Sequence, residues 1–176
     1  MLHLLLGAAL AGPGVPGRAA VVDRVVADVD GHLVLLSDLA REAALASVDP
    51  GGTPFWDPDW RTAEERLVDA AVVRTIAANV QLYEPARQDV QRRLEAVRAQ
   101  FPDRRAWRAF LELLVVDEDR LSVVLRRRMV VDRYLTRKLV VKPTEVEEFK
   151  AAALLHLDDL RQATRVRRIP AISETP

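Results

Sequence analysis

The sequence predicts a mainly helical protein with a small antiparallel sheet, made of an N-terminal hairpin and a C-terminal strand. Residues 21–36 read as two short strands rich in Val and Leu around Asp30-Gly31, a dipeptide typical of tight hairpins. Most of the remaining chain repeats apolar residues at helical spacing. Residues 164–170 alternate apolar and basic side chains, and we expect residues 165–169 to add a third strand to the hairpin, which would be marginal alone.

The composition is typical of one soluble domain. The chain has 176 residues, of which 49% are hydrophobic and 30% charged, so it can bury a core over residues 20–176. Acidic and basic residues balance at 26 each, which argues against a nucleic-acid partner. The absence of cysteine excludes disulfides and thiolate metal sites.

Residues 1–19 resemble a secretory leader. A short apolar run from Leu4 to Ala11 precedes Gly and Pro, and small residues at Gly17 and Ala19 favour cleavage after Ala19. No Lys or Arg precedes the apolar run, which is atypical of a leader. We therefore expect export to the periplasm, with a cytoplasmic N-terminal tail as the alternative. No later segment has the apolar length of a membrane helix, so membrane contact would be peripheral at most.

The first helix is expected over residues 38–47, because Ser37 is a good N-cap and Asp38 suits the first turn. Residues 48–60 then hold three prolines and two glycines and are predicted to be a loop. Three of the chain's nine aromatic residues, Phe55, Trp56 and Trp60, lie in this loop. Two interpretations remain: the rings fold back onto the core, or they form an apolar contact surface for a partner.

The second helix begins after Thr62, which forms a capping box with Glu65. Its predicted buried stripe runs from Leu67 through Ile76 to Val80 and Tyr83.

Four further helices follow from the positions of proline and aspartate. Pro85 opens one that ends near Phe101, Asp103 begins another, Asp117 begins a long one reaching about Val140, and the last spans residues 144–163. Trp107 and Phe110 recur at helical spacing in the second of these. In the long helix, Arg126-Arg127-Arg128 is either a solvated face or a contact for an anionic partner.

The residue patterns predict no active site, metal site or cofactor. The histidines at positions 3, 32 and 156 are not spaced to share a metal, and each is best interpreted as a surface residue. Ser37 is explained by capping, and Ser122 lies within a predicted helix without a histidine partner in the pattern. No glycine-rich phosphate loop is present, so we expect no nucleotide and no catalytic residue.

The opening segment VVDRVVADVDGHLVLLSDL resembles the start of SurA-type periplasmic chaperones. The matching positions are Val22, Asp23, Val25, Val26, Ala27, Val29, Asp30, Gly31, Leu35, Ser37 and Asp38, with Asp30 where the family usually has Asn. Residues 66–135 resemble the helical core of that family, and VKPTEVEEFKAA resembles the segment before its parvulin prolyl-isomerase domain. Here the chain passes directly to LDDLRQATRVRRIPA, which resembles the family's final helix and strand, so the resemblance implies a chaperone module without the catalytic domain.

The resemblance implies an ATP-independent holdase that binds unfolded outer-membrane or other exported proteins through an apolar cleft. We predict Phe55, Trp56 and Trp60 as client contacts, with Trp107 and Phe110 as further candidates that also suit the core. The alternative is a non-catalytic assembly subunit that forms a homodimer by exchanging its C-terminal elements. Isomerase activity is not expected, because no stretch remains to build a parvulin site.

Overall fold

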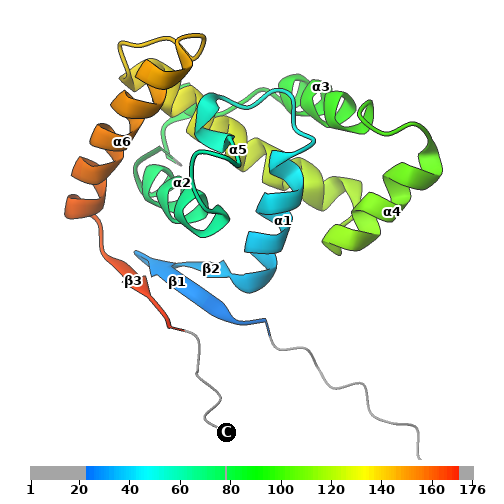
Figure 1. The fold of residues 1–176 in the computed structure, drawn as a ribbon, viewed down its shortest axis with the longest axis horizontal. Coiled ribbons are helices and arrows are strands. Elements are labelled where there is room, and N and C mark those ends of the chain that lie inside the picture. Colours follow the sequence, from blue (N-terminus) through cyan, green and yellow to red (C-terminus); the bar gives the residue numbers. More distant parts are fainter. Residues whose placement is uncertain (1–22, 78, 171–176) are drawn as a thin grey trace, which may run out of the picture.

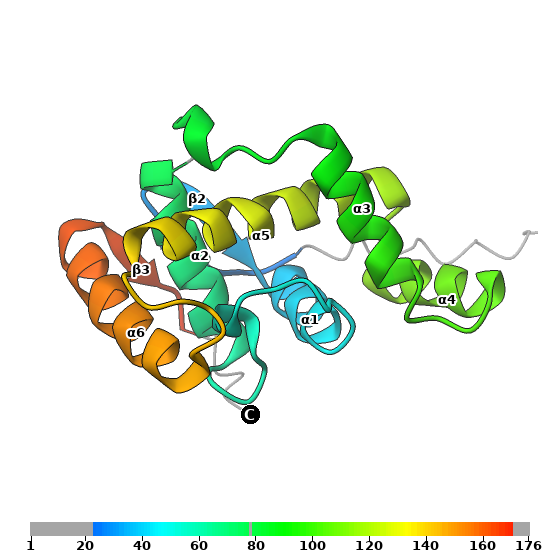
Figure 2. The same cartoon turned by 90° about the horizontal axis from the view of Figure 1, so that it is seen from above.

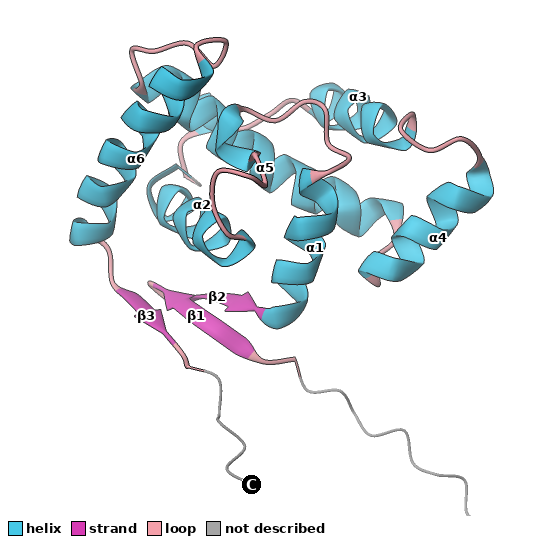
Figure 3. Cartoon of the chain, viewed as in Figure 1, coloured by secondary structure: helices cyan, strands magenta, loops and turns pink. Residues whose placement is uncertain are grey.

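The computed structural model describes residues 23–77 and 79–170 (Figure 1). The expected leader and its cleavage site after Ala19 lie outside the described residues. Within those residues the fold class is the one that the sequence predicts: a helical body rests on a small antiparallel sheet, and the strands gather at one side of the molecule (Figure 3).

The sheet joins the two ends of the described chain. Strands β1 (Val25–Val29) and β2 (His32–Leu35) form the hairpin, and β3 (Val166–Arg168) pairs with β1 on its other side, in the order β2-β1-β3. Both turn residues have positive φ, 48° at Asp30 and 83° at Gly31, which explains the Asp-Gly pair. The Asp30 N–H donates to the Arg165 carbonyl at 3.0 Å, and the Ile169 N–H to the Val26 carbonyl at 2.9 Å.

Six helices make up the body in the described part of the chain. Their bounds are α1 Leu36–Ala46, α2 Ala63–Ala77, α3 Arg87–Arg98, α4 Arg104–Leu114, α5 Glu118–Lys138 and α6 Val146–Ala163, with single 3₁₀ turns η1 at Pro54–Trp56 and η2 at Gln81–Tyr83. Helix α5 crosses the middle of the molecule, while α3 and α4 lie on one side and α6 on the other (Figure 2).

Among the residues that the structure describes, three apolar clusters hold these elements together. One joins the 48–60 loop, α2, α5 and α6 around Phe55, Tyr134 and Phe149. A second joins α1, α3, α4 and the first half of α5 around Trp107 and Leu121. A third packs the sheet onto α2. Because α5 contributes to the first two clusters and α2 to the first and third, these two helices fix the positions of all the others.

The first helix begins differently from the prediction. It starts at Leu36, and the Asp38 carboxylate accepts the Leu35 N–H at 3.1 Å. The Ser37 hydroxyl bonds to Asp23 instead of capping the helix, so the predicted N-cap is wrong. The reason is that the helix follows β2 without a linker, which leaves Ser37 already inside its first turn.

The second helix has the predicted start but an earlier end. Thr62 and Glu65 form the capping box, with the Glu65 N–H 3.2 Å from the Thr62 hydroxyl and the Thr62 N–H 3.0 Å from the Glu65 carboxylate. The helix ends at Ala77, so Tyr83 reaches the core from η2, where its ring packs edge-on against another tyrosine ring. Ile76 and Val80 are exposed, and the predicted buried stripe is wrong at these two positions.

Candidate ligand-binding groove

A hollow of about 350 Å³ opens between the hairpin, α1, α2 and α5. Two further hollows, of about 230 and 490 Å³, continue it along α5 towards α3. The first and second share Arg74 and Arg127, and the second and third share Glu84, Val123 and Arg126. We call these three adjoining hollows together the α5 groove. The first hollow, which we call its upper end, is lined by Gly31, His32, Leu33, Val34, Asp38, Arg41, Glu42, Trp56, Leu67, Ala70, Ala71, Arg74, Val124, Arg127 and Arg128.

The apolar surface of the groove comes from three elements. Leu67, Ala70 and Ala71 stand on one side of α2, and their spacing of three and four residues explains why they share a face. Val124 of α5 lines the same hollow. Leu33, which is 57% exposed, contributes from the hairpin. Apolar side chains that meet in an open hollow can cover the apolar side chains of a ligand.

Strand β2 is an edge strand of the sheet, and it borders the upper end of the groove. The Leu36 N–H bonds to the Arg24 carbonyl, and His32 and Val34 lie opposite Val29 and Ala27 in the ladder. Because hydrogen-bonding directions alternate along a strand, the backbone N–H and C=O of Leu33 face away from β1. An extended peptide could therefore add a strand at this edge.

The charges at the upper end do not balance. Its four arginines are accompanied by two carboxylates, Asp38 and Glu42. Both carboxylates are already engaged, Asp38 by Arg41 and the Leu35 N–H, and Glu42 by two buried arginines. Among the described residues, Arg74 and Arg127 make no ion pair and no side-chain hydrogen bond. Burial, and secondarily the nearby charge of Arg127, lower the pKa of Arg74 below its ordinary value, while Asp38 opposes the shift.

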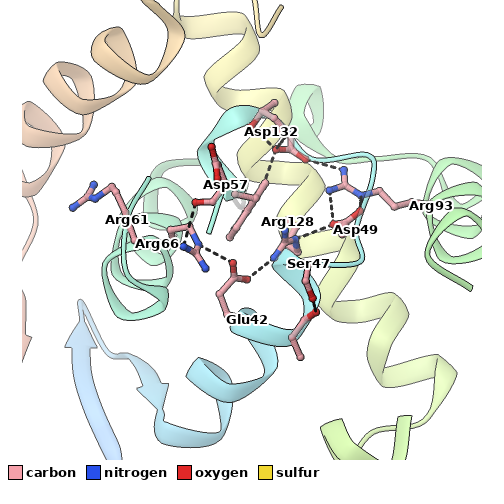
Figure 4. A network of polar contacts seen from close by, with 12 residues as sticks. Glu42, Ser47, Asp49, Asp57, Arg61, Arg66, Arg93, Arg128 and Asp132 are labelled. Carbon is pink, nitrogen blue, oxygen red and sulfur yellow. Dashed lines mark hydrogen bonds and ion pairs between the residues drawn. The ribbon is translucent and has the colours of Figure 1, made fainter. Parts of the chain in front are cut away.

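A buried ionic network, drawn in Figure 4, contributes Glu42 and Arg128 to the lining of the groove. Glu42 of α1 bonds to Arg66 of α2 at 3.0 Å and to Arg128 of α5, and all three side chains are at most 3% exposed. On the other side of Arg128, its Nε lies 3.1 Å from Asp49. We call the set of Glu42, Asp49, Arg66, Arg93, Arg128 and Asp132 the buried ionic network. It contains three carboxylates and three guanidinium groups, so its formal charges cancel.

The network also holds the 48–60 loop in place. Arg93 of α3 bridges Asp49 of the loop, at 2.7 Å, and Asp132 of α5, at 2.8 Å. The Asp132 carboxylate also accepts hydrogen bonds from the Thr53 hydroxyl at 2.7 Å and from the Trp56 indole N–H at 2.8 Å. The two carboxylates raise the pKa of Arg93 above its ordinary value, although burial, the largest single influence, opposes them.

The structure places the predicted client-contact residues mostly in the core. Phe55 is fully buried, and Trp56, Trp107 and Phe110 are at most 8% exposed. Trp60 is half-buried and packs edge-on against Phe55 at 6.1 Å. Of the five, only Trp56 lines the groove. The loop aromatics therefore fold back onto the core, and the interpretation as an exposed contact surface is corrected, because Asp132 and the surrounding helices hold the loop down.

The run Arg126-Arg127-Arg128 is divided between three environments. Arg126 pairs with Glu84 at the surface, Arg127 lies in the groove without a partner among the described residues, and Arg128 is buried in the ionic network. The interpretation as one solvated face is therefore wrong at Arg128. Since the three residues are consecutive in a helix, their side chains project about 100° apart and therefore reach three different environments.

Known kinds of catalytic or metal centre are not recognisable in the described part of the chain. No group of three metal-ligating side chains occurs there. Ser122 donates to a backbone carbonyl of its own helix, and His156 bonds to the Tyr134 hydroxyl, so no serine is paired with a histidine among the described residues. None of the described helices is long and apolar enough to cross a membrane.

Comparisons with protein-family models, with curated proteins and with solved structures give no match. The function must therefore be argued from the groove itself.

Proposed function

We propose that this protein is a holdase that binds extended segments of unfolded polypeptide in the α5 groove, without ATP and without isomerase activity. The observation that carries the proposal is the coincidence of an apolar hollow with the free edge of β2. Side chains on one face of an extended client would contact Leu67 and Val124, while its backbone would pair with Leu33. A folded client has already buried its apolar side chains and paired its backbone, so the groove would bind unfolded chains in preference to folded ones.

The resemblance to SurA-type chaperones supports the same proposal and adds the periplasm as its compartment. The hairpin, the helical body and the returning strand that the sequence predicts are all present among the described residues. Clients that travel to an outer membrane carry alternating apolar strands that they cannot bury on the way. We expect weak binding at several client sites, because an unfolded chain loses conformational entropy on ordering.

The experiment is suppression of the aggregation of a urea-unfolded outer-membrane barrel protein after dilution, followed by light scattering. The test variant, Leu33→Ser with Val123→Ser, removes two apolar side chains that are 57% and 45% exposed in the groove. The matched control, Leu113→Ser with Leu155→Ser, removes side chains that are 73% and 70% exposed on α4 and α6. Because all four side chains are exposed, both variants should keep the wild-type unfolding midpoint.

We expect wild type and control to suppress aggregation at modest excess, and the groove variant to need roughly five to ten times more protein, as expected for losing about 1 kcal/mol of apolar contact. Equal activity of the two variants would contradict the groove as the binding site. A concentration-independent dimer in sedimentation with no effect on aggregation would favour the assembly-subunit alternative, and acceleration of a proline-limited refolding phase would contradict a non-catalytic role.

A further inference from the structure

We propose that Arg74 and Arg127 bind a carboxylate side chain of the client, so that the groove prefers extended apolar segments that contain an aspartate or glutamate. The proposal deepens the holdase function and depends on it. It rests on three observations at the upper end of the groove: an uncompensated pair of arginines, a buried guanidinium nitrogen without a partner, and apolar surface beside both.

The first observation is the surplus of positive charge. Arg74 comes from α2 and Arg127 from α5, and both line the same two adjoining hollows. The carboxylates that line these two hollows, Asp38, Glu42 and Glu84, are held by other arginines, so no described carboxylate there is free to neutralise the pair. Two cations that line the same partly desolvated hollow repel one another, and an anion bound to both would remove that repulsion.

The second observation is independent of the first. Arg128 lines the same hollow, is 3% exposed and bonds through Nη1 to Glu42, yet its Nη2 is buried with no hydrogen-bond partner among the described residues. Its guanidinium stacks over the Trp56 ring, with Cζ 4.0 Å from the ring centroid. A buried donor without an acceptor is costly, so a ligand oxygen that reached it would be favoured.

The third observation identifies the class of ligand. The cationic pair adjoins Val124, Leu67 and the outward-facing backbone of Leu33, so an anion bound there would belong to a molecule that also offers apolar groups and backbone hydrogen bonds. An extended polypeptide with an acidic side chain among apolar ones has all three. Charge complementarity thus selects among unfolded segments that the apolar surface alone would bind equally.

The test measures binding of three fluorescein-labelled nonapeptides of alternating Val and Thr by fluorescence anisotropy. They differ only at the central residue, which is Glu, Gln or Lys. We expect the Glu peptide to bind wild type about tenfold more tightly than the Gln peptide, as is typical of a charge-assisted hydrogen bond, and the Lys peptide to bind most weakly. Raising the salt concentration should reduce the preference for Glu.

The decisive variant is Arg74→Gln with Arg127→Gln, and the matched control is Arg104→Gln with Arg108→Gln, two exposed arginines of α4 outside the groove. We expect the groove variant to bind the Glu and Gln peptides with affinities within about twofold of one another, because the charge-assisted contact is removed. The control should keep the tenfold ratio. Arg74→Lys with Arg127→Lys should keep part of it, since charge remains but the planar fork is lost.

The outcomes separate this inference from the holdase proposal. Equal binding of the Glu and Gln peptides to wild type would overturn the carboxylate preference and leave the holdase function in place, whereas failure of all three peptides to bind would overturn the holdase function itself. A preference that survives in the groove variant would place the carboxylate contact elsewhere. If the two arginines instead proved necessary for cosedimentation with phosphatidylglycerol vesicles, without any peptide preference, they would serve a lipid surface and the proposal would be wrong.

Discussion

The buried ionic network and the α5 groove are adjacent and both depend on arginines, but their charges are arranged in opposite ways. In the network every arginine faces a carboxylate: Arg66 contacts Glu42, Arg93 contacts Asp49, and Arg128 lies between these two acids. In the groove Arg74 and Arg127 have no acidic partner among the described residues. The difference indicates that matched charges hold this fold together, whereas unmatched ones are available to a ligand.

The cost of burial explains the division. An ion removed from water without a partner loses several kcal/mol of solvation, so arginines at 2% to 8% exposure must be paired. Arg74 is only half-buried and Arg127 is exposed, so water still solvates both, and the fold tolerates them unpaired at a small cost. The two regions should therefore respond differently to the removal of charge.

The largest effect is expected from Glu42→Gln. The change leaves Arg66 and Arg128 buried without their shared carboxylate, which should lower the free energy of unfolding by about 3–5 kcal/mol. Urea unfolding followed by circular dichroism measures the loss. The matched control is Glu112→Gln, because Glu112 is exposed on α4 and forms no ion pair with a described residue. A loss under about 1 kcal/mol at position 42 would contradict a structural role for the network.

An effect of intermediate size on stability is expected at Glu65, the capping-box carboxylate of α2. The N–H and then the hydroxyl of Thr62 hydrogen-bond to Glu65 and lower its pKa below the ordinary value of 4.5, although desolvation opposes them. The pKa of Glu65 is lower in the folded than in the unfolded chain, so its ionised carboxylate stabilises the fold. This stabilisation is fully present above about pH 4.5 and is lost as pH falls through the folded-state pKa. Glu65→Gln should thus cost up to about 1 kcal/mol at pH 7, as is typical of a lost cap, and progressively less in acid.

The measurement for Glu65 is urea unfolding of wild type and variant between pH 2 and pH 7. Glu64→Gln is the control, because Glu64 lies in the same helical turn and takes no part in the capping box. A difference between wild type and Glu65→Gln that does not change with pH would show that the capping box stabilises the helix by shape alone, without the carboxylate charge.

The features that the sequence predicts best are local or depend on a repeating pattern. The Asp30-Gly31 turn and the Thr62–Glu65 capping box each depend on residues at most three positions apart, and both occur as predicted. The alternation of residues 165–169 and their resemblance to a known final strand predict the returning strand, and β3 pairs with β1 as expected. In contrast, Ser37 satisfied the local rule for an N-cap, but the continuity of β2 with α1 overrode it.

The groove and the network could not be predicted from the sequence, because both bring together residues far apart in the chain. Glu42 and Arg128 are 86 positions apart, and Arg93 and Asp132 are 39 apart. A weak signal existed in Arg128, which lies at the spacing of the buried positions Leu121, Leu125 and Asp132 and thus on the inner face of α5. The same periodicity argues against a solvated face for the whole arginine run.

The smallest effect, and the one that tests the comparison most directly, is expected from Arg74→Gln with Arg127→Gln. Removing these charges should leave the free energy of unfolding unchanged or raise it by up to about 0.5 kcal/mol, because it removes a repulsion and breaks no pair. The repulsion is screened by salt, so any gain measured in 10 mM buffer should disappear in about 0.5 M sodium chloride. Urea unfolding at the two salt concentrations provides the measurement, with Arg104→Gln and Arg108→Gln as the control for a simple reduction of positive charge. Destabilisation by more than about 1 kcal/mol would mean that the groove arginines are structural after all, and the contrast between matched and unmatched charges would then fail.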